Sequence, residues 1–251
     1  MGSILHVYSR GVEQRDIFLN DLDRRVFRVF MREALRTHDV GLLAYCLMGN
    51  HFHLLVAVGQ HPVWRGMHRL LMRYSGYFNQ KYQRVGHLFQ GRFQSILCLD
   101  DAYLIHLVAY IHKNPVRAGL VAHPRDWAWS SHGEFSGGAQ SFIELGRLGQ
   151  ATGFTPEELQ QRYAERLSES NSMLPLKLLA AQAAGIAGVS LEKLLNGGSD
   201  AVCTRARRLL LAMATNEGYT LCDVAKLLGC SESALSQLRR KSQSNKECPT
   251  A

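Results

Sequence analysis

The first half of the sequence has a long stretch without an acidic residue. Between Asp39 and Asp100 there is no Asp and no Glu, although the chain has 21 acidic residues in all. Basic residues interleave with aromatic ones there: Arg65, Arg69, Arg73, Lys81, Arg84, Arg92, Tyr74, Tyr77, Phe78 and Tyr82. Solvated surfaces usually mix both signs of charge, so this bias and the formal net charge of +8 favour contact with nucleic acid. A basic but merely solvated face is the plain alternative.

Other features that the sequence lacks exclude whole classes of protein. Its six cysteines form no C-x-x-C pair and no zinc-ribbon spacing, which indicates reduced thiols. No apolar run reaches the roughly 18 residues of a membrane span. We therefore expect a cytoplasmic, nucleoid-associated protein with no membrane partner. No G-x-x-x-x-G-K-[ST] pattern is present either, which argues against an accompanying helicase.

Strand-like and helix-like patterns alternate in the first part of the chain, with a Gly49-Asn50 hairpin signal between two apolar runs. The expected strands are 3–11, 40–48, 51–58 and 94–100. A first helix is expected within residues 16–38, with Asn20 or Asp21 as its cap, a second from about 63 to 82, and a third from Asp100 or Asp101 to about 113. This interleaving predicts an α+β fold with an antiparallel sheet. Pro115 is expected to close the last of these helices at Asn114 and to begin a short new one.

The composition loosens around "SGGAQ", residues 136–140, and the remainder is rich in Leu and Ala. We expect a first domain over residues 1–133, a connecting helical region over 134–171 and an all-α domain over 172–251. Near the C-terminus, residues 221–228 and a helix that begins at Ser231 or Ser233 resemble a helix-turn-helix with a basic end. A plain helical hairpin is the alternative.

Two histidines one residue apart stand in the apolar run "YCLMGNHFHLLV". Side chains alternate along a strand, so His51 and His53 share one face while Phe52 and Leu54 share the other, apolar face. Two neighbouring imidazoles can form half of a divalent metal site that leaves positions for a further ligand and substrate. Two surface histidines on an exposed sheet face are the alternative.

A tyrosine and an asparagine one helical turn apart occur in "YLIHLVAYIHKNPVRAGLV". Near a metal, Tyr110 could attack a phosphodiester as its phenolate, and Asn114 would lie four residues further along the helix. A free phenol has a pKa near ~10, so it needs deprotonation or nearby positive charge. The alternative for Tyr110 is simple packing against the sheet.

Several motifs occur in order along residues 1–133: "SRG", "YCLMGNHFHLLV", "GHLFQGRFQSIL", "YIHKNPVRAGLV" and "WSSH". Together they resemble the REP-associated tyrosine transposases, which are single-tyrosine HUH nucleases. The resemblance implies a ferredoxin-like antiparallel sheet with flanking helices. It also implies Tyr110 as the nucleophile, His51 and His53 as metal ligands with Asn114 as the third, and Mg²⁺ or Mn²⁺ as the cofactor.

The reaction implied by this resemblance is cleavage of single-stranded DNA at a palindromic hairpin, through a 5′-phosphotyrosine and a free 3′-OH. A monomer is expected, with a dimer as the alternative. The expected DNA-binding residues are Arg10, Arg65, Arg69, Arg73, Arg92, Arg117, Ser233, Gln237, Arg239 and Arg240.

The chain departs from the family pattern at two positions. Gly49 stands where proline is usual, and His132 stands where tyrosine is common, which could alter a base or phosphate contact. A second hypothesis is a catalytically silent, domesticated DNA-binding regulator, and a third is a replication-initiator nuclease of the wider HUH class.

Overall fold

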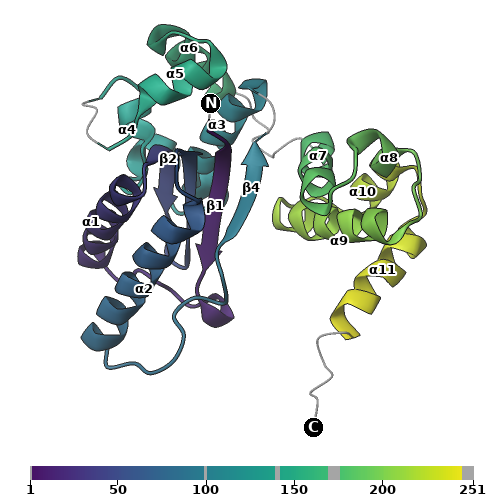
Figure 1. Cartoon of the computed structure of the whole chain (residues 1–251), viewed down its shortest axis with the longest axis horizontal. Helices are drawn as coiled ribbons and strands as arrows, with labels where there is room; N and C mark the ends of the chain where they lie inside the picture. The colour runs from purple at the N-terminus through teal and green to yellow at the C-terminus, as the bar shows by residue number, and fades with distance from the viewer. Residues whose placement is uncertain (1, 99–100, 139–141, 169–175, 245–251) are drawn as a thin grey trace. The chain divides into compact units, whose positions relative to one another are not determined.

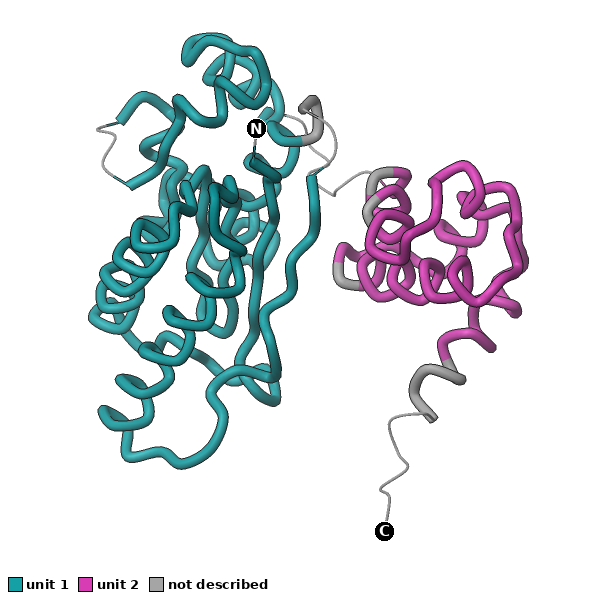
Figure 2. Tube along the Cα trace, in the orientation of Figure 1, with its two compact units in different colours: residues 1–172 teal, residues 173–251 magenta. Residues whose placement is uncertain are grey.

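The computed structural model describes residues 2–98, 101–138, 142–168 and 176–244. The chain divides into two compact units, Met1–Ser172 and Met173–Ala251, shown in different colours in Figure 2. In the described residues no helix is long and apolar enough to cross a membrane.

The first unit is built on a four-stranded antiparallel sheet. Its strands are β1 (Ile4–Arg10), β2 (Val40–Leu47), β3 (His51–Val58) and β4 (Gln94–Cys98), in the spatial order β2-β3-β1-β4. The short helix η1 (Val12–Gln14) and then α1 (Asp21–Thr37) connect β1 to β2, while α2 (Val63–Lys81) connects β3 to β4. This βαββαβ arrangement with β1 inside the sheet is ferredoxin-like, so the predicted α+β fold is confirmed.

Helices α1 and α2 lie together on one face of the sheet (Figure 1). Aromatic rings hold them there: the ring of Phe27 on α1 lies 5.1 Å from Phe52 on β3 and 5.0 Å from Tyr74 on α2. All three side chains are fully buried. The face that carries Phe52 is therefore the main core, as strand alternation predicts.

Helix α3 (Asp101–Arg117) contacts β2, β3 and β4. It continues through Pro115, so the expectation of a helix end at Asn114 is wrong. Proline cannot donate the backbone hydrogen bond that the carbonyl of Ile111 would normally receive. The side-chain amide of Asn114 donates to that carbonyl at 3.4 Å and to the carbonyl of Tyr110 at 2.9 Å, which satisfies the helix locally. Gly119, with φ of 68°, follows the helix end.

The "WSSH" motif is structural. Backbone and side-chain groups of Trp129 and Ser131 bond to β2 at Leu47 and Tyr45. His132 is buried, and its Nδ1 hydrogen bonds to the hydroxyl of Tyr163. This region contains η2 (Pro124–Asp126), α4 (His132–Phe135), α5 (Leu145–Thr152) and α6 (Pro156–Ser168).

The second unit is helical in its described residues. Its helices are α7 (Leu176–Ala187), α8 (Leu191–Leu195), α9 (Ala201–Asn216), α10 (Leu221–Leu228) and α11 (Glu232–Ser244). Thr220 and Asp223 form a capping box at the start of α10, and Gly229 ends it in a left-handed conformation. Leu235 of α11 is buried, and α11 contacts both α9 and α10.

A buried carboxylate joins α1 to α2. Asp23 is fully buried and accepts hydrogen bonds from Lys81 at 2.7 Å, from Tyr82 at 2.8 Å and from Tyr77 at 3.1 Å. It also completes the helix cap at Asn20, one of the two predicted capping residues. Burial alone would raise the pKa of Asp23, but these donors outweigh burial and hold it below its usual range.

We predict that Asp23→Asn lowers the free energy of unfolding by about 2–3 kcal/mol at neutral pH. The reason is that the buried donors would then face a neutral amide in place of the charged carboxylate that accepts their hydrogen bonds. The folded-state pKa lies below the unfolded value of about 3.9, so the contribution of Asp23 is present above that pH. It is lost as the pH falls through the folded pKa, and the two proteins should then converge in stability. Urea unfolding at several pH values measures this.

Asp21→Asn is the matched control, because Asp21 begins the same helix but its side chain is 61% exposed. An equal loss of stability in both variants at neutral pH would contradict the role given to the buried carboxylate.

Candidate active site

The histidine pair lies on the sheet face opposite the α1–α2 core. His51 and His53 alternate with Phe52 along β3, and their rings are 5.0 Å apart at nearly perpendicular planes. In the antiparallel pairing with β1, Arg10 is directly opposite His51 and Tyr8 is opposite His53. Cross-strand partners share a face, so Arg10 lies beside the pair.

A third histidine, His6 of β1, adjoins this pair and was not identified from the sequence. Its Nε2 lies 3.0 Å from Nδ1 of His53, and the two rings stack with centroids 5.1 Å apart. His6 and His53 are both buried. The sequence does show that His6, Tyr8 and Arg10 alternate along one face of a strand. That this face adjoins His51 and His53 follows only from the pairing of β1 with β3.

In both His51 and His53, the ring nitrogen Nδ1 lies within hydrogen-bond distance of a neighbouring side chain. Nδ1 of His51 lies 2.6 Å from the side-chain oxygen of Asn50, and Nδ1 of His53 is bonded to His6. This leaves Nε2 of each ring as the nitrogen that could bind a metal ion. The residues present therefore fit a site with two imidazole ligands.

Burial keeps the site histidines neutral. It lowers the pKa of His6 to about 3 and, together with the nearby charge of Arg10, that of His51 to about 4. The pKa of His53 lies well below its ordinary value, first because of burial and then because of His51 and His6. Neutral imidazoles are the form that binds metals, so these side chains need no deprotonation at pH 7.

Tyr110 of α3 faces the histidines. Its ring centroid lies 6.0 Å from that of His53 and 6.4 Å from that of His6, both edge to face. The guanidinium of Arg117 lies 5.0 Å from the centre of the tyrosine ring. The structure thus brings together the predicted Tyr110, His51, His53, Arg10 and Arg117.

Asn114 lies one turn after Tyr110 and is half-buried. Because its nitrogen donates to the α3 backbone, its oxygen is the atom that would serve as a ligand. Within the described residues, no group of three or more His, Cys, Asp and Glu side chains is arranged to hold a metal ion. A third ligand such as Asn114 falls outside those residue types.

Three predicted arginines lie elsewhere, on α2, which packs against the other face of the sheet. Arg69 and Arg73 form ion pairs with Glu33 of α1, at 2.9 and 2.5 Å. Arg65 is exposed and its guanidinium lies 5.6 Å from the ring centre of Trp64. Arg92 is also exposed, just before β4.

The predicted contacts in the second unit lie on α11. Ser233, Gln237 and Arg239 are all exposed, while Leu235 between them packs inward. Ser233 also lies within hydrogen-bond distance of Ser231, at 3.0 Å between the hydroxyl oxygens. The side chain of Arg240 lies outside the described residues.

A protein-family model described as "Transposase IS200 like" matches residues 3–114 of the chain. Residues 3–114 are therefore similar to the IS200-like transposases. The matched segment includes every residue of the site except Arg117: His6, Arg10, His51, His53, Tyr110 and Asn114.

Two individual proteins resemble parts of this chain. A curated REP-associated tyrosine transposase from Haemophilus influenzae is 29% identical over 117 residues, which cover 42% of this chain and 66% of the relative. The solved structure of a REP-associated tyrosine transposase bound to a REP hairpin aligns with a TM-score of 0.46 and 16% identity, over 57% of this chain and 88% of that one.

Proposed function

We propose that the protein cleaves and rejoins single-stranded DNA at a palindromic, REP-type hairpin, with Tyr110 as the nucleophile. The observation that carries the proposal is the placement of Tyr110 against the His51 and His53 pair, with its ring 6.0 Å from that of His53. The match of residues 3–114 to the IS200-like transposase model supports the same reaction class.

In this mechanism the phenol oxygen of Tyr110 attacks the phosphorus of the scissile phosphodiester. A bond forms between that oxygen and phosphorus, and the bond from phosphorus to the 3′ oxygen of the preceding nucleotide breaks. The phenol loses its proton and the departing 3′ oxygen gains one, which leaves a 5′-phosphotyrosine and a free 3′-OH. The retained phosphoester energy lets the reverse attack rejoin the strand without a nucleotide cofactor.

Two arginines support these steps from within the site. The positive charge of Arg117, close to the ring of Tyr110, stabilises the negative charge that develops on the phenol oxygen. Arg10, opposite His51, can bind an oxygen of the scissile phosphate.

His51 and His53 would hold a divalent ion, Mg²⁺ or Mn²⁺, with Asn114 as a third ligand. When bound, such an ion polarises the scissile phosphate and favours departure of the 3′ oxygen. His6 positions His53: if its Nε2 accepts the proton on Nδ1 of His53, then Nε2 of His53 keeps the lone pair that a metal needs.

The substrate and the state of the protein follow from the same proposal. The net charge of +8 suits a DNA partner, and the resemblance of the sequence motifs to the REP-associated tyrosine transposases implies a REP-type hairpin as the substrate class. We propose a monomer located in the cytoplasm with the nucleoid. A catalytically silent DNA-binding regulator would need no nucleophile beside the histidines, and the contact of Tyr110 with them favours the enzyme.

We predict a metal-dependent covalent adduct between the protein and labelled single-stranded hairpin DNA, resolved on a denaturing gel. Tyr110→Phe should abolish it, by at least about a thousandfold, because it removes the attacking oxygen. His51→Ala should also abolish it.

Tyr77→Phe is the matched control, because Tyr77 lies on α2 and bonds to Asp23 on the far side of the sheet. Tight hairpin binding with no adduct in Mg²⁺ or Mn²⁺ would favour the regulator. An adduct that survives Tyr110→Phe would assign the nucleophile to another tyrosine.

A second prediction concerns metal binding by the full-length protein, followed with Mn²⁺ by electron paramagnetic resonance. His53→Ala should abolish binding at this site. His6→Phe should weaken it about tenfold or more, because it removes the acceptor for Nδ1 of His53, whereas His6→Gln keeps an acceptor oxygen near the same position. Equal affinities for His6→Phe and His6→Gln would exclude the positioning role of His6.

For the second unit, we propose that α10 and α11 form a helix-turn-helix that binds duplex DNA, with Ser233 and Gln237 near base edges and Arg239 and Arg240 near phosphates. The exposure of Ser233, Gln237 and Arg239 along α11 supports this.

The corresponding prediction is that Gln237→Ala and Arg239→Ala differ in effect. Arg239→Ala should weaken duplex binding uniformly across sequences and reduce its salt dependence. Gln237→Ala should instead reduce the difference in affinity between the preferred sequence and other sequences. Fluorescence anisotropy with several duplexes measures both. If the variant that combines Gln237→Ala and Arg239→Ala binds duplex DNA with unchanged affinity, α10 and α11 form a plain helical hairpin.

A further inference from the structure

A row of arginines runs along the outer face of α1. Arg25, Arg28, Arg32 and Arg36 are spaced three and four residues apart, so they form one stripe of the helix. The core residues of α1, such as Phe27 and Met31, are buried on its opposite side. The stripe spans about 16 Å along the helix, at 1.5 Å per residue.

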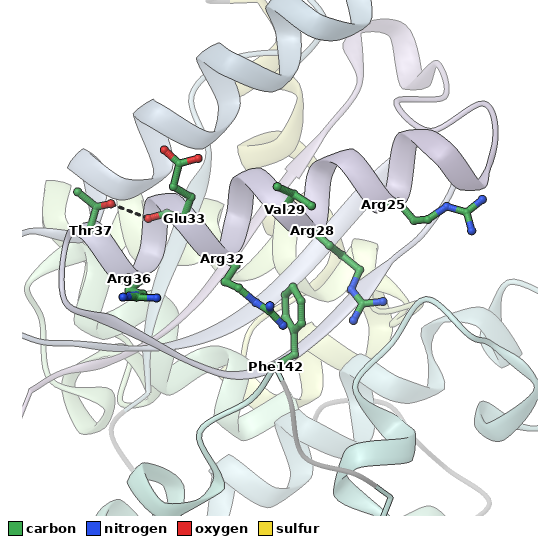
Figure 3. Close-up of a pocket in the computed structure, with 8 residues that line it drawn as sticks. All are labelled: Arg25, Arg28, Val29, Arg32, Glu33, Arg36, Thr37 and Phe142. Carbon is green, nitrogen blue, oxygen red and sulfur yellow. Dashed lines mark hydrogen bonds between the residues drawn. The ribbon is translucent and has the colours of Figure 1, made fainter.

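These four arginines line a groove of about 740 Å³, together with Val29, Glu33, Thr37 and Phe142. The side chains of Arg28 and Arg32 both reach the ring of Phe142, with guanidinium carbons 4.3 and 4.2 Å from its centre (Figure 3). Phe142 is itself tied down, because its backbone nitrogen donates to Glu134 at 2.8 Å. The groove is therefore built from packed side chains.

Positive charge predominates among the residues that line the groove. Its one acidic lining residue, Glu33, points away from Phe142 and already binds Arg69 and Arg73 of α2 with its two carboxylate oxygens. The Nε of Arg28 is buried and has no hydrogen-bond partner among the described residues. Buried donors without an acceptor are costly, so this arrangement suits an anionic ligand.

The groove is separate from the candidate active site. Helix α1 covers the face of the sheet that carries Phe52, whereas His51, His53 and Tyr110 lie on the other face. An anion bound here would not contact the reacting atoms.

We propose that this arginine groove is a second DNA-binding surface, which holds the phosphate backbone of DNA outside the cleavage site without reading its sequence. A row of guanidiniums suits an extended polyanion better than a single phosphate. Arg28 and Arg32 cover the aromatic ring of Phe142, which favours phosphate contact over base stacking. The inference rests on the proposed function only in taking DNA, rather than another polyanion, as the ligand.

The test compares two variants of the full-length protein that each lose two charges. Arg25→Gln/Arg36→Gln removes exposed groove residues that do not hold Phe142. Arg125→Gln/Arg162→Gln is the control: Arg125 is highly exposed, and Arg162 stacks on Phe154 outside the groove. Binding of a labelled duplex of arbitrary sequence is measured by fluorescence anisotropy between about 50 and 200 mM salt.

For the groove variant we expect affinity about tenfold weaker, and a slope of log affinity against log salt reduced by about 2, because each lost phosphate contact removes about 0.9. The control should stay close to wild type. Equal behaviour of the two variants would overturn the proposal and leave an acidic protein segment as the class of ligand to consider.

The outcome is independent of the Tyr110 chemistry. If no covalent adduct forms but the groove variant alone loses DNA affinity, the groove is a DNA surface and the proposed catalysis fails. If adducts form at saturating DNA and the groove variant binds like the control, catalysis stands and the groove inference fails.

Discussion

The antiparallel register between β1 and β3 is the constraint on which the candidate site depends. It sets Arg10 opposite His51 and Tyr8 opposite His53, and it brings His6 within hydrogen-bond distance of His53. A slip of one residue would turn every side chain of a strand to the other face. The buried Phe52 resists such a slip because its ring packs against Phe27 in the α1–α2 core.

Local sequence pattern predicted the elements of this arrangement, but not the contacts between them. Alternation along β3 placed His51 and His53 on the face opposite Phe52, and the ferredoxin-like sheet followed from the family resemblance. His6 was missed because its significance comes from a strand far away in the sequence. The helix end expected at Asn114 was wrong because a side-chain amide took over the hydrogen bond that Pro115 cannot donate. Helix propensity alone does not account for a side chain that replaces a missing backbone donor.

The sequence alone also did not distinguish arginines that form ion pairs within the protein from arginines that line an open groove. The stripe on α2 looked like the obvious basic surface, yet two of its members pair with Glu33. Glu33 lies outside the acid-free stretch and reaches α2 only through helix packing. The arginines of α1, which lie among acidic residues in the sequence, line a groove whose single acid is already paired. The distribution of charge along the sequence therefore did not predict where positive charge gathers on the surface of the folded protein.

Among the described residues, no carboxylate is one of the charged groups that act on His51 or His53, and this shapes the chemistry of the proposed site. The strongest electrostatic influences on His53, apart from burial, come from His51, His6, Arg10 and Arg117. Neutral imidazole and amide ligands would leave the full charge of a divalent ion uncompensated, so the ion and the two arginines would all attract the phosphate. Imidazole nitrogen also suits transition-metal ions better than Mg²⁺, which prefers oxygen. The donor set thus favours Mn²⁺ over Mg²⁺, and the bound DNA would supply the missing negative charge.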